Sequence, residues 1–259
     1  MRIFIILLVT VASAFSAWGS VPRVIDIDSS FMKVFLPPGD LSTGRAIVCC
    51  PGGGYSDVAI GHEGYDWAPF FNNLGLTFVV LQYHLPAGDL TKPLGDVEKA
   101  FKVLTDSAAV WGIDPEQIGV MGSSAGGHLA SVVATHPTAA CRPSFQLLFY
   151  PVVSLAKCIT HAGTRNEFLG SCDSDELAAE YSAENKVKAD TPRAFIVHCG
   201  DDDVVHPQNS IRYYSALQRH GVPATLVMFP DGRHGWGYRG WFPHHDELLG
   251  LIVAWLKSF

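Results

Sequence analysis

A five-residue pattern, GSSAG at residues 122–126, constrains the fold of this chain more than any other feature. An apolar run at residues 118–121 precedes it, and a helical pattern at residues 125–135 follows it. A G-x-S-x-G pattern between a strand and a helix is typical of a sharp turn that presents its serine at the top of a sheet and tolerates only small neighbours. The same five letters also occur in ordinary loops, but this setting predicts that Ser124 is a nucleophile.

Short apolar runs alternate with helical patterns along the rest of the chain. The apolar runs predict strands at residues 46–50, 77–81, 118–121, 145–150, 194–199 and 224–229. Helices are predicted at residues 64–74, 94–109, 125–135, 208–220 and 244–257. Such alternation is typical of an α/β fold with a mostly parallel sheet and helices on both faces. A long polar stretch at residues 152–190 interrupts it and predicts a short lid-like insertion.

The first residues differ in kind from the rest. A basic start, an apolar run at residues 3–11 and small residues up to residue 17 are the parts of a secretory signal peptide. A membrane anchor and a buried first strand are the alternatives, but the run is shorter than the roughly 20 residues that span a bilayer. We therefore predict a signal peptide at residues 1–19, one catalytic domain at residues 20–259, and a secreted or periplasmic protein without stable membrane insertion after signal removal.

Charge and cysteine spacing limit the partners. The formal net charge is −7 and Lys and Arg form no basic run, so nucleic acid is not an expected partner and neutral substrates fit better. No CxxC or HExxH spacing occurs, so neither a metal nor another cofactor is expected. Cys49, Cys50 and Cys199 fall in predicted core strands. Cys158 and Cys172 flank a polar loop and are the first candidates for a disulfide in an exported chain.

A serine hydroxyl needs a base that accepts its proton and an acid that orients the base. In folds with this turn the order along the chain is Ser, acid, His. His234 lies between glycines after the strand at 224–229 and is the predicted base. Three aspartates follow the strand at 194–199; residue chemistry alone does not separate them, and we take Asp203 as the acid and the other two as turn formers. Core or surface roles suit the other histidines considered: His198, His206, His220 and His244.

A glycine-rich segment, PGGGY at residues 51–55, follows an early strand. Glycines allow close approach of the backbone and can point N–H groups at an oxyanion. The N–H groups of Gly53, Gly54 and Ala125 are the predicted oxyanion donors. A phosphate-binding loop is the alternative, but the segment lacks the Gly-Lys-Ser/Thr ending of a P-loop and the G-x-G-x-x-G spacing.

Together these motifs resemble the carbohydrate esterase branch of the α/β-hydrolase superfamily, in particular the acetylxylan esterase and bifunctional acetylxylan/feruloyl esterase type. The resemblance begins near Arg45 and includes CPGGGY at 50–55, HEG at 62–64, QYHLP at 82–86, PLGD at 93–96, GVMGSSAGGH at 119–128, NEFLG at 166–170, DDVV at 202–205 and GRHGWG at 232–237. The chain departs from common patterns of this group at Pro51, His84 and Cys199, where histidine, arginine and glycine are usual.

The resemblance implies an α/β-hydrolase fold, the triad Ser124, Asp203 and His234, and removal of acyl groups, usually acetyl, from acylated plant cell-wall polysaccharide or oligosaccharide such as xylan. A feruloyl esterase and an exopeptidase-type serine hydrolase are the alternatives among enzymes, and a non-catalytic binding protein on the same fold is the alternative among other classes. Four side chains are candidates to line the substrate cleft, or else to pack beneath it: Tyr55, His62, Phe168 and Trp236. Oligomeric state is left open.

Overall fold

The computed structural model describes residues 23–28 and 31–259. The signal peptide predicted at residues 1–19 lies outside the described residues. Everything below concerns the described part of the chain.

One eight-stranded sheet runs through the molecule in the order β1-β2-β4-β3-β5-β6-β7-β8. Its strands are β1 (Arg23–Ile27), β2 (Met32–Leu36), β3 (Ala46–Cys50), β4 (Thr77–Leu81), β5 (Ile118–Ser123), β6 (Phe145–Phe149), β7 (Arg193–Cys199) and β8 (Ala224–Phe229). Strands β3 to β8 pair in parallel, whereas β1 and β2 are antiparallel. The central strands are apolar and fully buried, as expected for strands covered on both faces. The predicted mostly parallel sheet is therefore confirmed.

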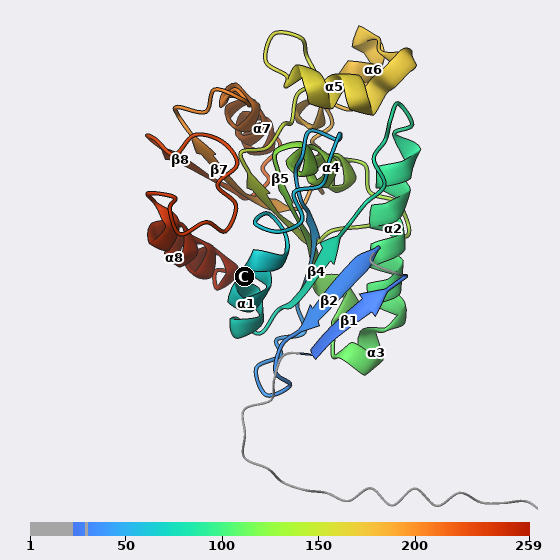
Figure 1. Cartoon of the computed structure of the whole chain (residues 1–259), viewed down its shortest axis with the longest axis vertical. Coiled ribbons are helices and arrows are strands. Elements are labelled where there is room, and N and C mark those ends of the chain that lie inside the picture. Colours follow the sequence, from blue (N-terminus) through green and yellow to red (C-terminus); the bar gives the residue numbers. More distant parts are fainter. Residues whose placement is uncertain (1–22, 29–30) are drawn as a thin grey trace, which may run out of the picture.

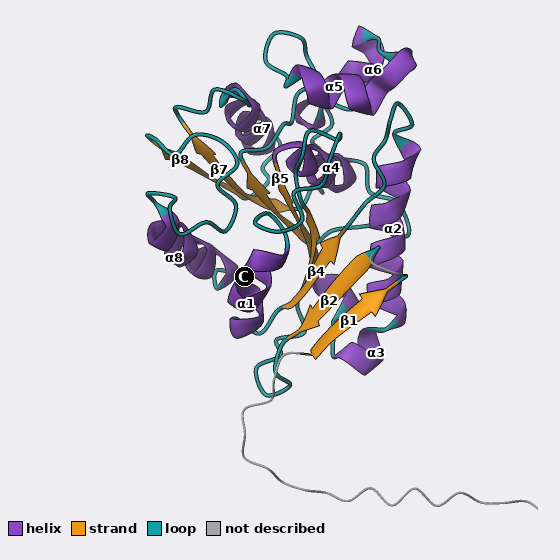
Figure 2. Cartoon of the chain, viewed as in Figure 1, coloured by secondary structure: helices purple, strands orange, loops and turns teal. Residues whose placement is uncertain are grey.

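Helices cover both faces of this sheet (Figure 1, Figure 2). On one face lie α2 (Thr91–Asp106), α4 (Ser124–Thr135) and α7 (Gln208–Arg219), with α3 (Ala108–Trp111) beyond α2. On the other lie α1 (Ala68–Asn73), with the 3-10 turn η1 (Tyr65–Trp67) before it, and α8 (His245–Leu256). A further 3-10 turn, η2 (Pro115–Gln117), leads into β5. Each layer of helices packs its own apolar core against the sheet. The ends of the strands are therefore left for the loops.

The predicted insertion joins β6 to β7 and is partly helical. It contains α5 (Ala162–Leu169), η3 (Gly170–Cys172), α6 (Asp175–Glu180) and η4 (Ala183–Asn185). The buried Arg165 anchors it, donating to the carbonyl of Leu155 at 2.7 Å and to the carboxylates of Asp173 and Asp175. Within the described chain no helix is both long and apolar enough to cross a membrane.

The cysteines behave only partly as predicted. Cys49, Cys50 and Cys199 are buried in β3 and β7, which confirms their core role. The predicted bridge between Cys158 and Cys172 is absent, since both thiols are free and exposed. The loop that this bridge would staple is already held by the ion pairs of Arg165.

Candidate active site

The serine turn is built from backbone contacts. Strand β5 ends at Ser123 and α4 begins at Ser124, whose φ of 52° lies in the left-handed region. A side chain other than glycine there stores roughly 1–3 kcal/mol of strain. A Cβ on Gly126 would lie 2.0 Å from the carbonyl oxygen of Cys50, and one on Gly122 would lie 2.1 Å from that of Gly126. The predicted sharp turn with small neighbours is present.

His234 contacts this serine from the loop after β8. Its Nε2 lies 2.9 Å from Oγ of Ser124, and its side chain is only 14% exposed. The loop turns through Gly232 and Arg233, both with positive φ, which brings the imidazole back over the end of β5. The structure thus joins the predicted nucleophile and the predicted base in one hydrogen bond.

The predicted acid is wrong by one residue. Nδ1 of His234 donates to Oδ2 of Asp202 at 2.7 Å, whereas Asp203 is exposed and lies outside this hydrogen-bonded chain. The reason is the turn after β7, in which the N–H of Asp202 donates to the carbonyl of Cys199 and the N–H groups of Val204 and Val205 close over Oδ1 of Asp202. That turn points the second aspartate inward.

Asp202 is held as a carboxylate. Burial raises its pKa, but the hydrogen bonds from His198 and His234 and the charge of His234 hold the pKa well below its ordinary value. His198 is buried beside it, with Nε2 3.2 Å from Oδ2. A permanently ionised partner fixes the proton of His234 on Nδ1 and leaves Nε2 free to accept one from Ser124.

Asp201 has a separate role that its position in a row of three aspartates conceals. Its carboxylate accepts from the backbone N–H of Arg233 at 2.8 Å and of Gly232 at 3.3 Å. These bonds fasten the loop that carries His234 to the end of β7. Asp202 therefore holds the imidazole of His234, and Asp201 holds the backbone of the loop that carries it.

The glycine loop after β3 lies against the serine. A Cβ on Gly52 would fall 2.9 Å from Cβ of Ser124, and Gly53 and Gly54 adopt φ of 124° and 66°. The N–H of Gly52 donates to Oε2 of Glu63 at 2.6 Å, so the N–H groups of Gly53 and Gly54 remain as the loop's candidates for an oxyanion. Ala125 is the second residue of α4, where N–H groups have no partner within the helix.

Three of the four predicted cleft residues are packing residues instead. Tyr55, Phe168 and Trp236 each have 0% exposure, and His62 is partly exposed. Tyr55 stacks on Phe168 with ring centroids 5.3 Å apart and donates its hydroxyl to Nδ1 of His128. Tyr55 and Phe168 are enclosed by α4 and the insertion and support the glycine loop from beneath, whereas Trp236 packs against Phe149, Tyr150 and Phe242 in the core on the other face of the sheet. None of these three rings can touch a substrate in this structure.

His161, which precedes α5 at the rim of the site, was not among the predicted site residues. A Cβ on Gly54 would lie 3.7 Å from its Cε1. Its Nδ1 accepts from the N–H of Thr164, so a neutral ring carries its proton on Nε2. Burial lowers its pKa, and the charge of His234 lowers it further while Asp202 raises it, which places the ring beside the triad. The length of the insertion was the only signal in the sequence that it could contribute to the site, and that signal does not single out His161.

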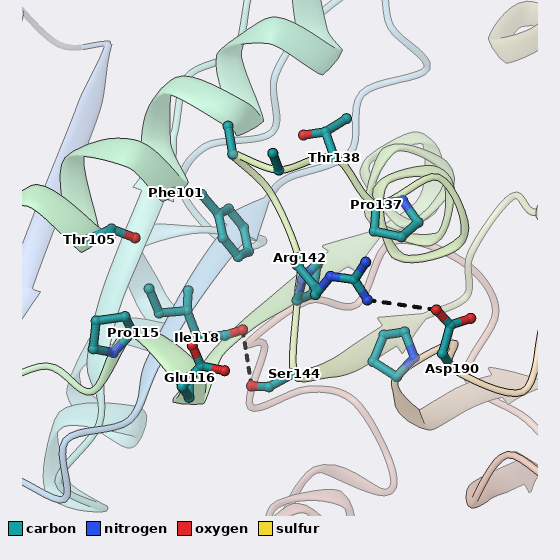
Figure 3. A pocket seen from close by; sticks show the side chains of 14 residues that line it. Phe101, Thr105, Pro115, Glu116, Ile118, Pro137, Thr138, Arg142, Ser144 and Asp190 are labelled. Atoms are coloured by element: carbon teal, nitrogen blue, oxygen red, sulfur yellow. Dashed lines mark hydrogen bonds and ion pairs between the residues drawn. The ribbon is translucent and has the colours of Figure 1, made fainter.

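A cavity of about 710 Å³ opens at the ends of the strands opposite to Ser124, where β5 and β6 begin (Figure 3). Its walls include Phe101 of α2, Ile118, Arg142 and Asp190, with the last two 3.6 Å apart as an exposed ion pair. None of the candidate site residues described above lines it. The triad and its loops lie at the carboxyl ends of the strands, where open α/β sheets place their sites.

Known proteins resemble this chain in sequence and in fold. The model of the prolyl oligopeptidase family matches residues 91–258, which is more than half of the chain, and a model named BD-FAE matches residues 32–146. The solved acetyl ester-xyloside bifunctional hydrolase of Caldicellulosiruptor lactoaceticus superposes with a TM-score of 0.82 at 31% identity, covering 94% of this chain and 98% of that one.

Two curated relatives are named for activities on xylan. An acetylxylan esterase of Xylanibacter ruminicola is 44% identical over 231 residues, which is 88% of this chain and 48% of the relative. Endo-1,4-beta-xylanase B of Butyrivibrio fibrisolvens is 32% identical over 203 residues, or 71% of this chain and 31% of the relative. The chain thus spans about half the length of the first and a third of the second. It belongs to the prolyl oligopeptidase family, has the α/β-hydrolase fold and is similar to the acetylxylan esterase type.

Proposed function

We propose that this chain is a serine carboxylic ester hydrolase that removes acetyl groups from xylan or a related cell-wall polysaccharide. The hydrogen-bonded chain from Ser124 through His234 to Asp202 is the observation that carries the reaction type. Such a chain, beside a glycine loop and the start of a helix, is the arrangement that acyl transfer through serine requires.

The first half of the reaction forms an acetyl-enzyme. Oγ of Ser124 attacks the ester carbonyl while Nε2 of His234 takes its proton, and the negative oxygen is met by the N–H groups of Gly53, Gly54 and Ala125. The sugar hydroxyl then leaves with the proton from His234. Asp202 stays ionised throughout and stabilises the imidazolium that forms between these steps.

The second half releases acetate. Water takes the place of the sugar, gives a proton to Nε2 of His234 and attacks the acetyl carbonyl of the Ser124 ester. Collapse of the second tetrahedral intermediate returns that proton to Oγ. The net reaction is ester plus water to acetate plus a free sugar hydroxyl, and its steps use the chain's own side chains and backbone N–H groups.

The substrate rests on the relatives. The curated relative at 44% identity is an acetylxylan esterase, and the structural neighbour at 31% identity is an acetyl ester-xyloside hydrolase. An ethyl acetate hydrolase of Pseudomonas putida, at 24% identity, also has a small acyl group in its name. These names favour a short acyl group over a feruloyl group and over the peptides that the family description suggests.

The test compares three substrate classes in one preparation. Acetate release from acetylated xylan, ferulate release from feruloylated arabinoxylan and hydrolysis of aminoacyl p-nitroanilides are measured with the wild type and with Ser124→Ala. We expect acetate release, and a fall of at least about 10⁴-fold in the variant. Ferulate release without acetate release would show that the substrate is a feruloylated and not an acetylated polysaccharide. Release of p-nitroaniline alone would show that the reaction is cleavage of a peptide-type bond and not of an ester.

We also propose that the chain is exported, because a polysaccharide substrate lies outside the cell and residues 1–19 have the parts of a signal peptide. Expression of the full chain followed by N-terminal sequencing of the protein outside the cytoplasm tests this. A protein that keeps Met1 and stays in the cytoplasm would contradict it.

A further inference from the structure

A buried carboxylate that the mechanism does not use lies next to the triad. Glu63, in the loop between β3 and η1, is 3% exposed. Its Oε2 accepts from the N–H of Gly52 at 2.6 Å, and its Oε1 accepts from the hydroxyl of Tyr150 at 2.7 Å. A buried charge costs several kcal/mol unless it is well bonded, so a carboxylate kept here needs a reason.

Tyr150 continues the contact toward the base. It follows β6, with a φ of 37°, and its hydroxyl accepts from the N–H of Gly237 at 2.9 Å while donating to Glu63. Its ring meets the imidazole of His234 edge to face, with centroids 4.7 Å apart. Burial and the charge of Glu63 raise the pKa of Tyr150 well above its ordinary value, so the phenol keeps the proton that it donates.

These three hydrogen bonds, Gly52 to Glu63, Tyr150 to Glu63 and Gly237 to Tyr150, join loops that are far apart in sequence. Gly52 opens the glycine loop after β3, and Gly237 lies in the loop after β8 that carries His234. A Cβ on Gly52 would lie 2.5 Å from Oε2 of Glu63 and 2.9 Å from Cβ of Ser124, so Gly52 is enclosed between the carboxylate and the serine turn. His62 Nε2 is 3.9 Å from Oε1, too far for a hydrogen bond.

We infer that Glu63 is a positioning residue that couples the oxyanion loop to the base loop through Tyr150. It commits the N–H of Gly52, which turns the next two N–H groups of the loop toward the oxyanion, and it fixes the tyrosine ring against which His234 rests. The inference rests on the proposed function only in that the oxyanion is that of an ester. Both carboxylate oxygens already accept hydrogen bonds and the group is enclosed, so Glu63 acts through other groups and not on substrate.

Substitution at both ends of the contact tests the coupling. Glu63→Gln leaves one acceptor for two donors, and Tyr150→Phe removes the hydroxyl that Gly237 and Glu63 share. For p-nitrophenyl acetate we expect each to lower kcat about 10- to 100-fold with KM within about 3-fold, because the alignment matters most in the transition state. Both substitutions break the same contact between Tyr150 and Glu63. The kcat of the double variant should therefore be no more than about 3-fold below that of the less active single variant.

Tyr213→Phe is the matched control. Tyr213 is equally buried, and its hydroxyl makes one bond to Gln146 at 3.0 Å near the start of β6, toward the ends of the strands opposite to Ser124. We expect its kcat within about 2-fold of wild type even if its thermal midpoint falls as far as that of Tyr150→Phe. A control that loses as much kcat would reduce the role of Tyr150 to general stability.

Two further measurements keep the test decisive. Glu63→Asp, which keeps the charge, takes the place of Glu63→Gln if the latter does not fold. The rate of Ser124 modification by a fluorophosphonate probe is measured for every variant, because it reports the aligned serine and base without ester turnover. A wild type that reacts with the probe but cleaves no ester would remove the proposed function and leave the coupling testable. Fully additive losses, or losses confined to KM, would overturn the coupling.

Discussion

The turn that carries Ser124 and the loops that carry its partners are held by different forces. The turn is fixed by backbone packed on backbone, with Gly126 against the carbonyl of Cys50. The loop of His234 is fixed by side chains that bond its backbone, those of Asp201 and Tyr150. A backbone contact admits no change in residue size, whereas a side-chain contact can be weakened in steps. The two regions should therefore fail in different ways.

The largest expected effect separates two neighbouring acids. Asp202→Asn should lower kcat on the order of 10³- to 10⁴-fold, because an amide facing Nδ1 favours the tautomer of His234 that cannot accept a proton from Ser124. Asp203→Asn, at an exposed side chain, should stay within about 3-fold. Steady-state kinetics on p-nitrophenyl acetate decides between them. Equal losses would mean that the acid is not selected by the turn after β7.

The serine turn should break as a whole. Gly126→Ala places a methyl group between two backbone segments that cannot move apart, and we expect at least about 3 kcal/mol lower stability with little folded protein. Gly95→Ala is the control, since Gly95 lies inside α2 with nothing within 4 Å of the added carbon. That control should gain about 0.5–1 kcal/mol from helix propensity. Urea unfolding measures both, and a stable Gly126→Ala would contradict the packing.

The support beneath the glycine loop should depend on pH. Burial lowers the pKa of His128 to about 4, below the roughly 6.5 of an unfolded histidine. At a pH between these two values the unfolded chain binds a proton at His128 and the folded chain does not. The contribution of neutral His128 to the free energy of unfolding is therefore complete above about pH 6.5. It is lost as the pH falls toward 4, and the loss reaches up to about 3 kcal/mol. His128→Gln keeps a donor for Tyr181 and an acceptor for Tyr55 but does not titrate. Urea unfolding at pH 7 and pH 5 should show that the free energy of unfolding falls more for wild type than for His128→Gln. An equal fall in both proteins would refute the prediction.

The smallest expected effect concerns the base loop. Asp201→Ala removes two bonds to the backbone of Gly232 and Arg233, and kcat/KM should fall about 10-fold because His234 is held less well. Asp114→Ala is the control: it also removes an exposed side-chain bond to a backbone N–H, at η2 on the far edge of the sheet. It should leave kcat/KM unchanged. A loss shared by both variants would point to stability and not to position.

How far the sequence predicts this molecule follows from the same distinction. The strand, the turn and the helix around Ser124 depend on residues within one short segment, so their pattern predicts them. The central strands are recognisable because burial on both faces makes them uniformly apolar. The antiparallel strands β1 and β2 carry a weaker pattern, with every second side chain of β2 only half buried, and were not predicted.

The residues that the sequence misassigned are those whose place depends on distant contacts. Asp202 and Asp203 have the same chemistry, and only the closing of two N–H groups over one of them decides which faces His234. Tyr55 and Trp236 lie beside the glycine loop and the base along the chain, and Phe168 lies in the insertion, yet helix α4, the insertion and neighbouring rings enclose them. Nothing in the local pattern distinguishes an aromatic ring that faces a cleft from one that supports it.

The contact from Gly52 through Glu63 and Tyr150 to Gly237 has a consequence for engineering. Exchange of single loops between relatives is a common way to change what an esterase accepts, and it treats each loop as an independent module. Here the first and last loops share one buried acid and one phenol supplied from the middle of the sheet. A chimera that imports either loop should therefore import the acid, the phenol and the opposite loop together.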